Sequence, residues 1–142
     1  MSVRLGLPFF ALAFTLASAC AHAAADLPPE QVEFFETKIR PILVDHCYAC
    51  HSAQADEIEG GLMLDNRAAL QKGGDSGRLL VPGQPGQSRL LVAIEYNDEN
   101  FQMPPDGKLP DEVLANFRKW IELGAPDPRD GAAPGPHDII TA

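Results

Sequence analysis

The sequence has 142 residues, the size of one domain, and a formal net charge of −9. Because neutralising phosphates requires clustered lysines and arginines, 20 acidic against 11 basic side chains exclude a nucleic-acid-binding surface as the main function. The 12 glycines and 13 prolines exceed average usage, which predicts short helices joined by long ordered loops.

Residues 1–25 have the three parts of a secretory signal. Arg4 precedes an apolar run over residues 5–17, and a series of small residues follows. The favoured cleavage site is Ala-His-Ala at 21–23, with cleavage up to residue 25 as an alternative. The apolar run is too short for a membrane span, which needs about 20 residues. We therefore expect residues 1–23 to be a signal peptide and the mature protein to be periplasmic or otherwise exported, without a transmembrane segment.

Cys20 permits a second interpretation of the same segment. Residues 17–20 resemble a degenerate lipoprotein box in which alanine replaces the usual first leucine. Because a better cleavage site lies just downstream, we expect no lipid anchor at Cys20 and its removal with the signal. The mature chain then retains two cysteines, Cys47 and Cys50.

The next stretch of the chain is predicted to be helical. Apolar residues between Val32 and Leu43 recur with a 3/4 spacing, which indicates a helix with one buried face. Pro41 lies inside this pattern and should kink the helix or start a new turn. After the cysteine-containing segment 45–55, residues 56–110 are rich in loops, with two short helical candidates over 66–72 and 87–96.

A final amphipathic helix is predicted over residues 111–123. Pro110 suits its first turn and Gly124 ends it. Residues 29–126 are therefore expected to form the domain. The proline- and glycine-rich residues 127–142 are expected to be a disordered tail or linker.

Cys47, Cys50 and His51 form the pattern C-x-x-C-H, the attachment signature of c-type haem. Two thiols three residues apart on a helical turn can each add across one vinyl group of a haem. The histidine directly after the second thiol then lies beneath the iron and can bind it. The sequence therefore predicts one covalent haem c, attached through Cys47 and Cys50, with His51 as an axial iron ligand.

Three other interpretations of the motif are weaker. A thioredoxin-like redox pair requires a βαβ context, and no strand pattern lies nearby. A disulfide between cysteines three residues apart closes a very small loop and gains little entropy. A zinc site using His46 together with the motif would lack the second well-spaced ligand pair that zinc sites usually have.

Met103 is the candidate for the second axial ligand. Pro104 and Pro105 stiffen the loop that follows it, and a soft, neutral thioether favours Fe(II) and raises the reduction potential. The alternative is that Met103 only packs its loop. Met63 is expected to pack at the haem edge, and His46 is tied to the same turn as His51 and should not reach the opposite face. The only other histidine left after signal removal, His137, lies in the tail and is a weak candidate.

The stretch from Phe34 to Pro128 resembles the planctomycete cytochrome c domain, a relative of class I cytochromes c. The resemblance rests on segments 35–43, 47–51, 60–65, 73–77, 81–83, 88–91, 102–105 and 120–126. It implies a small all-α fold whose first and last helices pack together, and a haem bound axially by His51 and Met103. The chain departs from the pattern at Pro110, where a small capping residue is more usual. Such domains also often head longer exported proteins.

Apolar side chains spread along the chain are expected to surround the haem. They are Phe35, Leu43, Leu64, Leu91, Ile94 and Trp120. Arg78, Arg89 and Lys108 are candidates for contacts with the haem propionates, the alternative being that each is a solvated charge.

Two functions from different classes follow. In the first, the protein is a one-electron carrier and not an enzyme, and its acidic balance suits redox partners with basic docking patches. In the second, it is the haem domain of a larger exported enzyme or a ligand-binding sensor with a vacant or labile iron site. The two differ in whether Met103 is a firm ligand.

Overall fold

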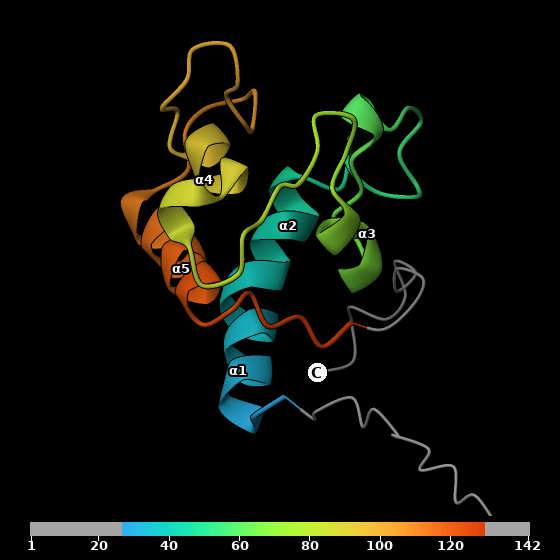
Figure 1. The fold of residues 1–142 in the computed structure, drawn as a ribbon. Coiled ribbons are helices and arrows are strands. Elements are labelled where there is room, and N and C mark those ends of the chain that lie inside the picture. Colours follow the sequence, from blue (N-terminus) through green and yellow to red (C-terminus); the bar gives the residue numbers. More distant parts are fainter. Residues whose placement is uncertain (1–26, 130–142) are drawn as a thin grey trace, which may run out of the picture.

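The structure, a computed structural model, describes residues 27–129, and every regular element within that range is a helix. The all-α prediction is therefore confirmed for this part of the chain. The predicted signal peptide, Cys20 and His137 lie outside the described residues. The helices are α1 (Pro29–Phe34), η1 (Phe35–Ile39), α2 (Arg40–His46), η2 (Glu59–Gly61), α3 (Arg67–Lys72), η3 (Pro85–Gln87), α4 (Arg89–Ile94) and α5 (Asp111–Glu122), shown in Figure 1.

The first three elements follow one another without a break, and η1 is a π-helical turn. Pro41 has no N–H to continue an α-helical ladder, and just before it the Arg40 N–H bonds to Phe35 O, five residues back. The predicted new turn at Pro41 is confirmed, since α2 begins at Arg40. Phe35, Ile39 and Leu43 form the buried face, each at most 1% exposed.

Helix α5 packs against η1 through aromatic rings, as predicted for the first and last helices. The ring centroid of Trp120 lies 6.0 Å from that of Phe35 and 6.0 Å from that of Phe117. Gly124, with φ +95°, follows the helix, as predicted. Pro110 lies one residue before the helix rather than in its first turn. The buried apolar face of α5 thereby closes the core over the N-terminal helix.

The two short helical candidates in the middle of the chain are both present. Asn66 caps α3, because its side chain accepts a hydrogen bond of 2.8 Å from the Ala69 N–H. The second helix, α4, is shorter than the predicted range 87–96. It follows a 3₁₀ turn over Pro85–Gln87, and the backbone turns away at Tyr96, which has φ +60°.

The ordered packing continues past residue 126, where the sequence predicted that the domain ends. Figure 1 shows the segment after α5 crossing the N-terminal helix toward the side of α3. The indole N–H of Trp120 donates to Pro126 O at 2.8 Å, and Asp127 and Arg129 are only 3% and 7% exposed. The predicted disorder is thus wrong for residues 127–129, because internal partners that composition does not reveal hold them. Residues 130–142 lie outside the described part.

Candidate functional site

The cysteine motif forms a single turn at the end of α2. The N–H groups of Cys47 and Tyr48 both bond to Leu43 O at 3.0 Å, which carries the chain out of the helix. The N–H groups of Cys50 and His51 then bond back to Cys47 O at 3.2 and 2.9 Å. The two cysteines and the histidine therefore share one compact turn, as their spacing predicted.

The two thiols of this turn are both free, and they differ in environment. The Cys50 side chain is exposed, whereas Cys47 is half-buried against the core. Burial raises the pKa of the Cys47 thiol to about 12. Cys47 therefore stays protonated at neutral pH in the folded chain, and the more accessible sulfur is that of Cys50.

His51 is held by both its ring and its backbone. Its Nδ1 lies 3.3 Å from Leu62 O, and its own carbonyl accepts a hydrogen bond of 2.8 Å from the Leu64 N–H. Because a carbonyl oxygen only accepts, this contact assigns the ring proton to Nδ1 and leaves the Nε2 lone pair available to a metal. Iron-binding histidines are oriented in this way, so the donor set fits a covalently attached haem.

The loop after the motif is fixed by an acidic side chain that sequence reasoning missed. Asp65 is 0% exposed, and its carboxylate accepts bonds from the Ala53 N–H at 2.6 Å and from Asn66 Nδ2 at 3.0 Å. An Asp-Asn pair directly before a helix is typical of a helix start, and this pattern in the sequence could have pointed to Asp65. Asp65 connects the segment that orients His51 to the residues directly after the motif.

A second group missed by the sequence surrounds Arg129. We call it the Arg129 cluster, and its members are Phe35, Tyr48, Leu64, Asp127 and Arg129. The Arg129 guanidinium donates to Tyr48 Oη, to Leu64 O at 2.8 Å and to both carboxylate oxygens of Asp127, and it stacks 4.8 Å from the centre of the Phe35 ring. No local pattern predicts these contacts, because Tyr48 and Arg129 are far apart in sequence.

The charges of this cluster depend on one another. Burial alone would lower the pKa of Arg129, but hydrogen bonding to Asp127 and its charge, with a contribution from Tyr48, raise that pKa above its ordinary value. Burial raises the pKa of the Tyr48 phenol, and the positive charges of Arg129 and Arg40 only partly offset the effect. At neutral pH the cluster is a charged arginine–aspartate pair bonded to a neutral phenol.

Met103 lies in the long loop between α4 and α5. Its N–H bonds to Ala93 O at 3.1 Å, and Met103 is 37% exposed. Pro104 next to it is buried, and its carbonyl accepts a hydrogen bond from Tyr96 Oη. This loop and the turn after α2 lie at the same end of the molecule in Figure 1. Ligation by Met103 stays a prediction.

The alternative ligands differ in their surroundings. Met63 is half-buried, and His46 is exposed at the last residue of α2. Among residues 27–129, no group of three or more histidine, cysteine or acidic side chains is arranged to hold a metal ion.

The side chains expected around the haem all belong to one apolar core, none more than 3% exposed: Phe35, Leu43, Leu64, Leu91, Ile94 and Trp120. Of the candidate propionate contacts, Arg78 and Lys108 are exposed, while Arg89 bonds to Ser76 O at 2.6 Å and stacks on the Phe101 ring. Arg89 is thus more than a solvated charge. Contact of these residues with a haem stays a prediction.

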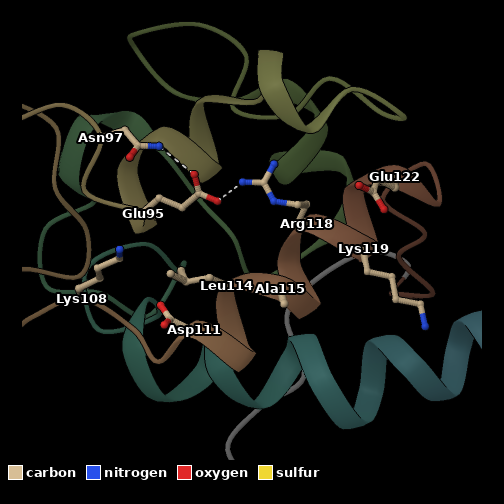
Figure 2. A pocket seen from close by; sticks show the side chains of 9 residues that line it. All are labelled: Glu95, Asn97, Lys108, Asp111, Leu114, Ala115, Arg118, Lys119 and Glu122. Atoms are coloured by element: carbon tan, nitrogen blue, oxygen red, sulfur yellow. Dashed lines mark hydrogen bonds and ion pairs between the residues drawn. The ribbon is translucent and has the colours of Figure 1, made fainter.

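A surface hollow of about 390 Å³ lies over α4 and α5, apart from the motif. Figure 2 shows Glu95 in this hollow accepting hydrogen bonds from both Asn97 and Arg118. None of the motif residues lines this hollow. It therefore adds nothing to the site built around the cysteines and His51.

Comparison with known protein families gives a match over part of the chain. Residues 47–107 match the family described as planctomycete cytochrome C, and this range begins at Cys47 and includes Met103. No curated protein and no solved structure matches the chain significantly. None of the helices in residues 27–129 has the length and apolar character needed to cross a membrane.

Proposed function

Because the chain carries a domain of the planctomycete cytochrome C family, we propose that it is an exported one-electron carrier with a class I cytochrome c-like fold. In this proposal Cys47 and Cys50 would hold one haem c covalently, and His51 and Met103 would bind its iron. The observation that carries the proposal is the His51 ring, which lies on the same turn as two free thiols and directs Nδ1 to Leu62 O.

Each residue of the turn has a definable role in such a carrier. When bound, the haem iron supplies the Fe(III)/Fe(II) couple for one-electron transfer. Cys47 and Cys50 would keep the group attached in both oxidation states through two thioether bonds. The Leu62 carbonyl orients the His51 ring and makes its Nε2 more basic by accepting the Nδ1 proton's hydrogen bond.

Met103 would complete the ligand set from the α4–α5 loop. Its backbone is anchored to Ala93 O, while its exposed side chain is not committed to the core. A thioether favours the ferrous ion, so this ligand raises the reduction potential relative to a second histidine. Ligands fixed on both sides limit rearrangement when the electron moves, which suits a carrier.

A second function, the haem domain of a larger exported enzyme or a ligand sensor, is favoured by one observation. Met103 is 37% exposed and is not packed in the apolar core, so an iron beside it would be open to a gas or to peroxide wherever this side chain did not bind. The two functions separate on whether Met103 stays bound in the ferrous protein.

Carbon monoxide binding distinguishes these two functions. For a carrier, we expect the ferrous protein to resist carbon monoxide and the Met103→Ala variant to bind it readily. Met63→Ala is the matched control, since it removes the other mature methionine and should leave the spectrum and the carbon monoxide resistance unchanged. Ready binding by the unaltered protein would contradict the carrier function, and an unchanged ferric spectrum in Met103→Ala would contradict the ligand assignment.

A further inference from the structure

We propose that Arg129 is a positioning residue for His51, acting through the backbone of residues 62–64. This inference rests on the proposed function, because positioning matters only if His51 binds the iron. Neither the C-x-x-C-H spacing nor the family match, which covers residues 47–107, includes Arg129.

A continuous chain of hydrogen bonds links the two residues. Arg129 Nη1 donates to Leu64 O at 2.8 Å, and the N–H of the same residue, Leu64, donates to His51 O at 2.8 Å. Two residues earlier, Leu62 O lies 3.3 Å from His51 Nδ1. The short segment 62–64 is thus fixed on one side by Arg129, and on the other it contacts both the ring and the backbone of His51.

Arg129 also contacts the motif turn itself. The same Nη1 donates to the hydroxyl of Tyr48, which lies between the two cysteines, and the guanidinium stacks over Phe35 in the helix beneath. One guanidinium therefore sets the distance between the turn 47–51 and the segment 62–64. A displacement of either would break a bond to Arg129.

The guanidinium is itself rigidly held. Asp127 accepts from Nε at 2.8 Å and from Nη2 at 2.5 Å in a two-pronged pair, and both side chains are at least nine-tenths buried. A buried ion pair contributes little net stability over an apolar packing of the same shape, because desolvating two charges is costly. The ion pair instead fixes the position of the Arg129 guanidinium. The guanidinium in turn holds Tyr48, in the same turn as His51, and Leu64, whose N–H bonds to His51 O.

Loss of the Arg129 cluster should therefore weaken the hydrogen bond of the His51 ring. A mobile Leu62 carbonyl accepts a weaker hydrogen bond from Nδ1, which lowers the basicity of Nε2 and favours the ferrous ion. Removing Arg129 alone would also leave the negative charge of Asp127, and this charge favours the ferric ion. The informative variant is therefore Asp127→Asn/Arg129→Gln, which removes both charges and leaves the net charge unchanged.

The test compares hydrogen exchange at three protons in the haem-bearing ferrous protein by NMR. These are His51 Nδ1–H, the Leu64 N–H, and the Leu90 N–H, which bonds to Leu79 O outside the cluster and reports general opening. In Asp127→Asn/Arg129→Gln we expect the first two to exchange at least tenfold faster relative to the Leu90 proton. We also expect the ferrous-to-ferric ratio at fixed applied potential to rise severalfold, a tenfold rise being about 59 mV for one electron.

The matched control removes a surface ion pair in the same way. Glu95→Gln/Arg118→Gln breaks the pair between α4 and α5 without touching residues 47–64. It should leave the exchange ratios and the potential unchanged. The inference would be overturned if this control raised the exchange rates of His51 Nδ1–H and the Leu64 N–H as much as Asp127→Asn/Arg129→Gln does. It would also be overturned if Asp127→Asn/Arg129→Gln raised all three exchange rates equally and left the reduction potential unchanged. A protein without haem would overturn the proposed function and the inference with it, whereas haem-bearing variants with unchanged His51 exchange overturn the inference alone.

Discussion

Replacing Trp120 with phenylalanine tests how the last helix and the segment after it close the fold. The indole is 0% exposed, packs against the rings of Phe35 and Phe117, and donates its N–H to Pro126 O at 2.8 Å. A phenylalanine ring retains the apolar contacts and removes this hydrogen bond. Trp120→Phe therefore isolates the bond and the small cavity left by the missing part of the indole.

The expected cost follows from these two losses. Leaving a buried carbonyl without its donor costs about 1–3 kcal/mol. The cavity raises the total to roughly 2–4 kcal/mol, and full truncation to alanine, which removes more apolar contact, should cost more in the same protein, about 3–5 kcal/mol. At about 4–8 °C per kcal/mol for a domain of this size, the midpoint of thermal unfolding should fall by at least about 8 °C.

Chemical denaturation followed by circular dichroism measures this free energy of unfolding in the unaltered protein, Trp120→Phe and Trp120→Ala. Amide exchange at the Arg129 N–H, which bonds to Asp127 Oδ1, reports whether residues 125–129 come loose locally. A loss in Trp120→Phe below about 0.5 kcal/mol, with unchanged exchange at Arg129, would refute the reasoning.

Three further predictions concern the backbone, the pH dependence and the partners. Gly73→Ala should lower the free energy of unfolding by more than about 2 kcal/mol, because φ is +79° and a Cβ would lie 2.2 Å from Gly77 O. Gly77→Ala, at φ +90° but with open space around the new Cβ, should lower it by only about 1–2 kcal/mol. Equal losses for the two variants in denaturant titrations would contradict this. Because burial raises the pKa of Tyr48, the unfolded chain loses this proton first, so stability should fall as pH rises above about 10, and Tyr48→Phe should flatten this slope in unfolding measurements at pH 8 to 11. Electron transfer with a redox partner that has a basic docking surface should slow as salt rises, since this chain carries −9, and stopped-flow rates independent of ionic strength would refute such docking.

Local signals in the sequence were sufficient for the N-terminal helix and for the motif. The periodic spacing of Phe35, Ile39 and Leu43 predicted the buried face of the N-terminal helix, and Pro41 marked its new turn. The spacing of Cys47, Cys50 and His51 predicted that they share one turn. These features depend on residues within a few positions of one another, so a pattern in the chain specifies them directly.

The contacts that orient the motif depend on distant residues and could not be read from the pattern. Leu62 offers only a backbone carbonyl to His51, which any residue type could supply. Arg129 lies in a segment whose proline- and glycine-rich composition predicted disorder. Its burial depends on Asp127, Tyr48 and Leu64 meeting in three dimensions. Composition measures average tendency, and it fails where a few specific partners hold a short segment.

The central claim, one haem attached through Cys47 and Cys50, is tested most directly on protein expressed in a host that matures c-type cytochromes. An intact mass together with a pyridine haemochrome spectrum reports the attachment. The account predicts a coloured protein whose mass exceeds that of the processed polypeptide by one haem, and loss of both thioether bonds in Cys47→Ser/Cys50→Ser. A colourless product with the mass of the polypeptide alone would contradict it.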